Sequence, residues 1–218
     1  MSKKTAVVIG ATGLIGGHLM KHLIQDDQYR EIVVLGRRPP ASSHPKIHFV
    51  TSNFQLSHLT HELPAHFDEV FCCIGTTIKK AGSQKAFRAV DYNIPLHLAK
   101  AAHHKGCPHF LLISSLGASP KSKAFYSKVK GELEEAIKEV GFEQFSVLRP
   151  SLLLGDRKET RLMEEIGKLL SPVLNLILVG SLKKYRAIEA STVAEKMYQV
   201  AQYETSGNHV YENQELLT

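Results

Sequence analysis

Short apolar runs alternate with longer segments of helical spacing along most of the chain. Residues 5–9, TAVVI, form the kind of β-branched run that is typical of a strand buried on both faces of a parallel sheet. Similar runs predict strands at residues 32–35, 47–50, 69–74, 109–114 and 143–148. Helical spacing predicts helices at residues 14–25, 56–63, 91–105 and 124–140. This alternation predicts an α/β protein with a mostly parallel, doubly wound sheet and helices on both faces.

The pattern changes after residue 154. Charged amphipathic spacing predicts a helix at residues 159–170, an apolar run follows at 173–179, and a further helix is predicted at 191–202. A short strand is expected at 208–211. Because no linker, repeat or low-complexity segment intervenes, residues 1–218 are expected to form a single domain. Residues 1–154 would form its core, and residues 155–218 a small substrate-side lid with the last sheet elements.

The composition is that of an ordinary globular protein, with 43% hydrophobic and 22% charged residues among 218. Two of the three cysteines, Cys72 and Cys73, are adjacent, which indicates a reducing compartment rather than a disulfide framework. No leader-like segment precedes the first strand, and the longest apolar stretch is far shorter than the ~20 residues of a membrane span. We therefore expect a cytoplasmic protein without a membrane span.

The net charge is +6, but no run of lysine and arginine exceeds two residues. Nucleic-acid binding is therefore disfavoured, because it requires a basic stripe and would show steep salt dependence. The 12 histidines include no HExxH motif, and no paired CxxC is present, so no metal site is expected.

The first strand leads into a glycine-rich loop, GATGLIG, at residues 10–16. Gly10 would allow a tight turn, Gly13 a close approach of pyrophosphate, and Gly16 close packing of the helix on the sheet. The spacing is one residue longer than the usual G-x-G-x-x-G. Free N–H groups at the start of the helix favour phosphate, so the loop predicts a dinucleotide site. The expected contacts also include Thr12, Leu14 and Ile15.

The residues after the second strand favour NADP(H) over NAD(H). An NAD site usually carries an acidic side chain at this point, to bind the ribose hydroxyls. This strand is instead followed by Arg37 and Arg38. Guanidinium groups suit bidentate contact with a 2′-phosphate. The alternative is that both arginines are solvated loop residues.

Three further side chains suggest acid–base chemistry. Tyr126 and Lys130 are four residues apart, so they share one face of the predicted helix. An ammonium group nearby stabilises a phenolate, which makes a tyrosine usable as a proton donor to a carbonyl oxygen. Ser114 and Ser115 end the fifth strand, at the edge where open α/β sheets bind their ligands. Either hydroxyl would be placed to hold the same oxygen.

Five segments together resemble a family. They are GATGLIG (10–16), CCIGTT (72–77), the Ser114–Ser115 strand end, YSKVK (126–130) and LRPSLLLGDR (148–157). Over nearly its whole length the chain resembles short-chain dehydrogenases/reductases of the extended or atypical type, which have a Rossmann fold. CCIGTT, the following KAG (80–82) and LLGDR resemble the small NAD(P)H-binding branch that includes the human Tat-interacting protein of 30 kDa and its bacterial homologues.

The resemblance implies roles for individual residues. Tyr126 would be the acid/base, Lys130 would bind the nicotinamide ribose and tune the tyrosine, and Ser115, or as the alternative Ser114, would orient the substrate carbonyl. Asn53 and Phe54 would lie near the adenine, although many relatives have Asp in place of Asn53. The loop along the cofactor would comprise Ile74, Gly75, Thr76 and Thr77. The nicotinamide side would include Pro150, Ser151 and Leu153.

Two functional hypotheses follow. The first is an NADP(H)-dependent oxidoreductase that moves a hydride between nicotinamide and a carbonyl or alcohol carbon. The second is an NADP(H)-binding regulatory or sensor protein with little turnover. The large substrate domain of the sugar-nucleotide enzymes is missing, which speaks against epimerase or dehydratase activity on nucleotide sugars. The substrate and the oligomeric state stay open, with a homodimer among the alternatives.

Overall fold

A seven-stranded sheet forms the centre of the computed structural model, which describes residues 3–40, 43–155, 186–203 and 206–217. Its strands are ordered β3-β2-β1-β4-β5-β6-β9, and all six pairings are parallel. The strands are β1 (Lys4–Ile9), β2 (Tyr29–Gly36), β3 (Ile47–Thr51), β4 (Glu69–Cys72), β5 (His109–Ile113), β6 (Gln144–Arg149) and β9 (Gly207–Glu212). The strand order reverses between β1 and β4, and open α/β sheets bind ligands beyond the carboxyl ends of strands at such a point.

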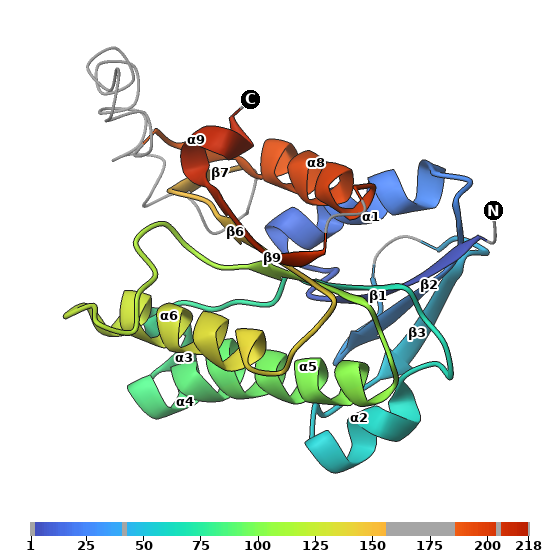
Figure 1. Cartoon of the computed structure of the whole chain (residues 1–218), viewed down its shortest axis with the longest axis horizontal. Helices are drawn as coiled ribbons and strands as arrows, with labels where there is room; N and C mark the ends of the chain where they lie inside the picture. Colours follow the sequence, from blue (N-terminus) through green and yellow to red (C-terminus); the bar gives the residue numbers. More distant parts are fainter. Residues whose placement is uncertain (1–2, 41–42, 156–185, 204–205, 218) are drawn as a thin grey trace.

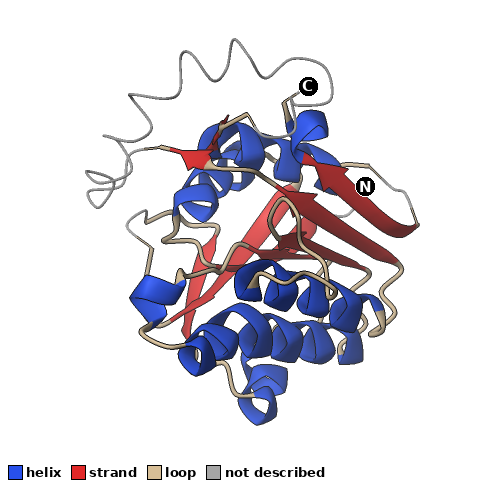
Figure 2. Ribbon diagram, turned by 90° about the vertical axis from the view of Figure 1, so that its left-hand side faces the viewer, coloured by secondary structure: helices blue, strands red, loops and turns tan. Residues whose placement is uncertain are grey.

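Helices cover both faces of the sheet (Figure 1). On one face lie α1 (Leu14–Gln25) and α8 (Ala190–Ala201), and on the other α2 (Leu56–Glu62), α5 (Ile94–His104) and α6 (Phe125–Lys138). Figure 2 shows the same layers from the side, with the sheet between the two sets of helices. The doubly wound α/β fold predicted from the alternating pattern is therefore confirmed.

Strand β1 shows why a continuous apolar run predicts a strand that is buried on both faces. Ala6 and Val8 pack into the core beneath α1 and α8, whereas Val7 and Ile9 pack into the core beneath α2, α5 and α6. Successive side chains of a strand point to opposite faces. A strand covered on both faces therefore needs apolar residues at every position, which is what this run provides.

One helix differs from its predicted extent. The segment expected to begin at Asp91 is the later part of a longer helical run that starts with α4 (Gln84–Arg88), passes through a π-helical turn (Ala89–Asn93) and ends in α5. Ser83 caps α4 by accepting a hydrogen bond from the Ala86 N–H. Asp91 is thus inside the helical run, with its side chain fully buried, rather than at the start of a helix.

Further short elements were not predicted. They are α3 (Ile78–Ala81), the paired strands β7 (Leu153–Leu154) and β8 (Ile188–Glu189), and α9 (Asn213–Leu216). The predicted helix at 159–170 and apolar run at 173–179 lie outside the described residues. The described part of the chain contains no helix with both the length and the apolar character needed to cross a bilayer.

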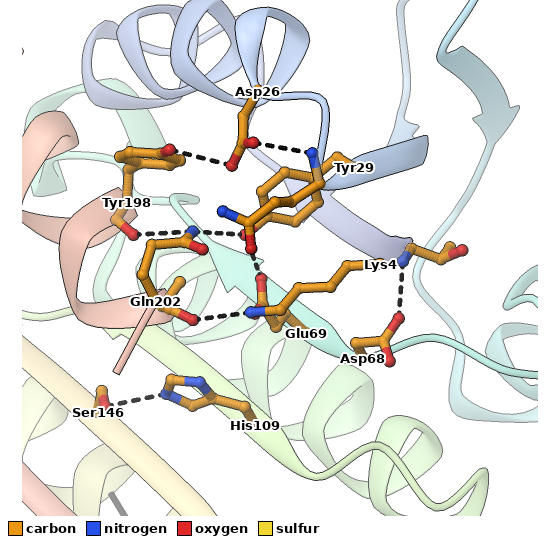
Figure 3. Close-up of polar contacts among 12 residues, drawn as sticks. Lys4, Asp26, Tyr29, Asp68, Glu69, His109, Ser146, Tyr198 and Gln202 are labelled. Atoms are coloured by element: carbon orange, nitrogen blue, oxygen red, sulfur yellow. Dashed lines mark hydrogen bonds and ion pairs between the residues drawn. The ribbon is translucent and has the colours of Figure 1, made fainter. Parts of the chain in front are cut away.

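Buried polar side chains gather near the amino ends of the strands, away from the switch point (Figure 3). The Glu69 carboxylate accepts hydrogen bonds from Lys4 Nζ and Tyr29 Oη, each at 2.5 Å. Gln202, just after α8, donates to the same tyrosine oxygen at 3.1 Å. Burial raises the pKa of Glu69 against the opposing effect of Lys4. This cluster joins α8 to β1, β2 and β4.

Candidate functional site

A cavity of about 610 Å³ opens at the switch point of the sheet, beyond β1, β2 and β4. Within the described residues, its lining includes three basic side chains and no acidic one. The lining residues are Gly10, Ala11, Thr12, Gly13, Val34, Leu35, Gly36, Arg37, Arg38, Phe54, Cys73, Ile74, Gly75, Thr76 and Lys80.

The glycine loop forms one wall of the cavity, and its backbone requires glycine. Gly10 has φ +80°, and a Cβ atom there would lie 2.6 Å from the backbone carbonyl of Cys73. A Cβ on Gly16 would collide with the Gly10 carbonyl oxygen. The first and third glycines of the motif therefore allow β1, β4 and α1 to approach one another at the cavity.

The start of α1 fits a negatively charged ligand. Gly13 is its N-cap, no side chain caps the helix there, and its first turn contains no acidic residue. The N–H groups of a first helical turn lack partners within the helix, and the helix dipole places positive charge there. Since Gly13 and Thr12 also line the cavity, this end of α1 has the geometry and polarity of a pyrophosphate site.

Arg37 and Arg38 stand at the far end of the cavity, directly after β2. Both side chains are exposed, and both line the cavity. Arg38 also lines an adjoining hollow of about 470 Å³, together with Thr12, Gly17 and Pro39. The described lining of this region therefore contributes two guanidinium groups and no carboxylate.

Phe54 lines the cavity in an unusual backbone conformation. Its φ of 60° makes it the one described non-glycine residue with positive φ. The Phe54 N–H donates to Ser52 Oγ at 2.9 Å, and its carbonyl oxygen is 3.2 Å from Nδ1 of His97. Asn53 does not line the cavity: its amide contacts His58 and accepts a hydrogen bond from the Gln55 N–H. Of the two residues predicted near the adenine, Phe54 lines the cavity and Asn53 does not.

Lys130 lies beneath the loop that follows β4. Its Nζ atom is 2.9 Å from Asp91 Oδ1, and both side chains are at most 3% exposed. The other oxygen of Asp91 accepts the Thr76 N–H at 2.8 Å. A Cβ on Gly75 would lie 3.5 Å from the carboxylate and 3.9 Å from Nζ. Gly75, which lines the cavity, therefore lies directly over this ion pair.

The negative charge of Asp91 keeps the buried Lys130 protonated. Burial on its own lowers the pKa of Lys130, but the Asp91 charge, assisted by Tyr126 and by the hydrogen bond to Asp91, raises it above the usual value. A buried ammonium without such a partner would tend to lose its proton. Asp91 was not identified from the sequence, where the residue was only the expected start of a helix. The sequence did offer one signal for Asp91, because it is an acidic residue on the apolar side of a helical pattern.

Tyr126, Ser114 and Ser115 are not among the residues that line the described cavity. Tyr126 is in the first turn of α6, 37% exposed, with its ring packed against Phe87 at 5.4 Å between centroids. The Ser114 hydroxyl donates to Glu134, a buried residue of α6. Ser115 Oγ is buried and has no hydrogen-bond partner within the described residues. Of the two hydroxyls left open by the sequence, Ser115 is therefore the one without a hydrogen-bond partner among the described residues.

Several residues expected at the site have other contacts. Leu14 and Ile15 pack into the core under α1, and Thr77 caps α3 through the Lys80 N–H. The Pro150 carbonyl accepts the Leu116 N–H, and the Ser151 N–H donates to Asn213. Leu153 belongs to β7. None of these six residues lines the described cavity, although Leu14 and Thr77 directly follow residues that do.

Comparison with known proteins agrees with this geometry. The family model described as NAD dependent epimerase/dehydratase family matches residues 6–209. The protein fmp52, mitochondrial, of Emericella nidulans is 35% identical over 198 residues, covering 86% of this chain and 83% of that protein. Protein HTATIP2 of Rattus norvegicus is 36% identical over 164 residues, covering 74% and 67%. The resemblance to this branch of short-chain dehydrogenases/reductases is thus confirmed.

The relatives contradict one expectation. The FMP52 proteins of Emericella nidulans, Coccidioides immitis and Candida glabrata are all named as mitochondrial. The cytoplasmic location inferred from the sequence is therefore wrong. That inference relied on three cysteines and the residues before the first strand. A reduced thiol indicates the redox conditions of a compartment but does not identify the compartment.

Solved structures match the fold at low sequence identity. MoeE5 in complex with UDP-glucose and NAD has a TM-score of 0.72 at 17% identity, covering 94% of this chain and 74% of that one. The Bordetella bronchiseptica enzyme WbmH in complex with NAD+ has a TM-score of 0.71 at 15% identity, covering 96% and 76%. These likenesses confirm the architecture.

Proposed function

Because this chain belongs to the NAD-dependent epimerase/dehydratase family, we propose that it is an NADP(H)-dependent oxidoreductase acting on a carbonyl or alcohol substrate. One observation carries the proposal. Lys130 is buried as an ammonium directly under the loop that lines the dinucleotide cavity, on the same helix face as Tyr126. Its position against Gly75 of the cavity lining supports a role for this ammonium at the site.

The cavity would hold the dinucleotide in an extended form. The α1 N-terminus and the glycine loop would bind the pyrophosphate, with Phe54 beside the adenine. Arg38, assisted by Arg37, would contact the 2′-phosphate, and the hollow that Arg38 shares with Thr12 supports this placement. Lys130 would hold the ribose of the nicotinamide from below Gly75. We further propose one domain over residues 1–218, with residues 155–218 supplying the substrate side.

A reduced dinucleotide held by the glycine loop, Arg38 and Lys130 would supply the hydride that reduces the substrate carbonyl carbon. The carbonyl oxygen receives a proton from the Tyr126 hydroxyl, which gives the alcohol, and the phenolate then regains a proton from solvent. Ser115 would orient the same oxygen through its hydroxyl, which has no hydrogen-bond partner among the described residues. The partial exposure of Tyr126 gives the substrate and solvent access to the phenol.

Substitution of Tyr126 tests this chemistry. Tyr126→Phe keeps the ring against Phe87 but removes the proton, so NADPH consumption with a panel of ketones and aldehydes should fall about 10²- to 10⁴-fold. Tyr203→Phe is the matched control, because Tyr203 is 65% exposed and has no place in the site. Equal rates for the two variants would contradict the role of Tyr126. Tight NADPH binding without turnover in the wild type would instead favour the sensor hypothesis.

A further inference from the structure

The turn after β3 has its hydrogen-bonding groups paired within the protein, although it borders the cavity. The Phe54 N–H donates to Ser52 Oγ at 2.9 Å, and the Phe54 carbonyl oxygen lies 3.2 Å from Nδ1 of His97. Because a carbonyl oxygen only accepts, the contact requires a hydrogen on Nδ1. Both backbone polar groups of Phe54 are thus engaged, while the residue lines the cavity.

Asn53 is engaged by the start of α2. Its amide nitrogen lies 3.2 Å from Nδ1 of His58, and its amide oxygen accepts the N–H of Gln55, the N-cap of α2, at 3.0 Å. The residue does not line the cavity. Both polar atoms of the Asn53 side chain therefore have partners in the protein, and neither is placed to bind a purine base.

Side chains from two helices fix this turn. Phe54 has φ 60°, a left-handed conformation that a residue with a side chain keeps only when its surroundings impose it. Ser52 is 3% exposed, and its hydroxyl donates to Glu62 of α2 at 2.5 Å while it accepts from Phe54. His97 reaches the turn from α5. We therefore expect the turn to keep these hydrogen bonds when a ligand enters the cavity.

The other lining residues do not replace the missing acceptor. The amino group of adenine is a donor, and a carboxylate would pair with it, but the described lining contains none. Its charged side chains, Arg37, Arg38 and Lys80, are donors only. Thr12 and Thr76 belong to the glycine loop and to the loop after β4, away from this turn in the sequence. Apolar contact and guanidinium stacking remain, and neither distinguishes one purine from another.

We propose that the cavity recognises the dinucleotide through its phosphates and not through its base, so that a hypoxanthine dinucleotide binds as tightly as the adenine one. The inference rests on the proposed function. The base would contact Phe54, and the affinity would come from the α1 N-terminus and the two arginines. Hypoxanthine exchanges the donor and acceptor of the adenine edge. A site that read this edge would be left with mispaired groups and would lose about tenfold or more in affinity.

Calorimetric titration of the wild type with NADPH and with reduced nicotinamide hypoxanthine dinucleotide phosphate tests the inference. The two Kd values should agree within about threefold, which is well below the loss expected from a mispaired group. NADH and reduced nicotinamide hypoxanthine dinucleotide are compared in the same way, so the base is tested with and without the 2′-phosphate. A larger preference for either base, in either pair, would overturn the inference.

Two variants separate the base from the phosphate. Asn53→Ala should leave the ratio of the adenine and hypoxanthine Kd values unchanged, and a changed ratio would show that Asn53 reads the base. Arg38→Ala should weaken NADPH and its hypoxanthine analogue by the same factor, and unequal losses would contradict the inference as well. A wild type that binds none of these dinucleotides would refute the proposed function and the inference together, whereas a base preference would refute the inference alone.

Discussion

At the scale of single residues, Gly10 explains why the sequence motif was informative. Its φ of +80° and the 2.6 Å approach of the Cys73 carbonyl leave no place for a side chain. The positive φ and the close approach both arise because the strand turns sharply into a helix beside a neighbouring strand. A glycine motif at such a turn therefore predicts them. Lys130 was also found from the sequence, through its spacing from Tyr126. Its partner Asp91 was not, because a contact between residues 39 positions apart leaves no local pattern.

Gly10→Ala should abolish dinucleotide binding and destabilise the fold. The new methyl group would collide with the β4 backbone, in addition to the strain of about 1–2 kcal/mol for an alanine with positive φ. Gly106→Ala is the matched control, because Gly106 has φ +79° but open space around it. Urea unfolding and NADPH titration are measured on both variants. Similar losses of stability, with binding intact in both, would show that the close approach at Gly10 is unimportant.

At the scale of elements, the strands and long helices were predicted to within a few residues, with two exceptions. β2 begins at Tyr29 rather than at residue 32, and the predicted helix start at Asp91 was wrong. Buried strands and amphipathic helices carry a repeating apolar signal that is read directly from the sequence. The π turn and the pairing of β7 with β8 carry no such repeat. They depend on contacts with distant parts of the chain.

The strand pair β5–β6 carries a buried histidine with a testable pH effect. His109 Nε2 lies 3.0 Å from Ser146 Oγ (Figure 3). Burial, with the charges of Lys4 and His209, lowers the pKa of His109 from 6.5 to about 4. Between these values the unfolded chain binds a proton that the folded chain does not. The free energy of unfolding should therefore fall as the pH is lowered from 6.5 to 4, by at most about 3 kcal/mol from this group.

Replacement of this histidine should remove that part of the pH dependence. His109→Gln is compared with wild type by urea unfolding at a series of pH values, and the difference between the two curves should change across the same interval. His66→Gln is the control, since His66 is exposed on a loop before β4. Curves for wild type and His109→Gln that run parallel over the interval would show that His109 titrates alike in both states.

At the scale of the whole molecule, parallel topology brings the separate motifs to one edge. The glycine loop, the arginines and the Gly75–Thr76 loop come from three different strands, yet all line one cavity, because β2, β1 and β4 are neighbours. The alternating pattern predicted parallel strands, but the strand order is set by long-range packing. The net charge of the chain is +6, and part of that positive charge lies at the cavity. The cavity lining carries basic groups, and the described residues contribute no acidic one to it.

The most direct test is a calorimetric titration of the protein with NADPH and with NADH, repeated on Arg37→Ala/Arg38→Ala. The wild type should bind NADPH more tightly than NADH, because only NADPH carries the phosphate that these guanidinium groups would meet. The double variant should lose most of that preference while still binding NADH. If the wild type binds neither dinucleotide, the assignment of the cavity is wrong. Equal affinities that the arginine substitutions leave unchanged would contradict the NADP(H) preference.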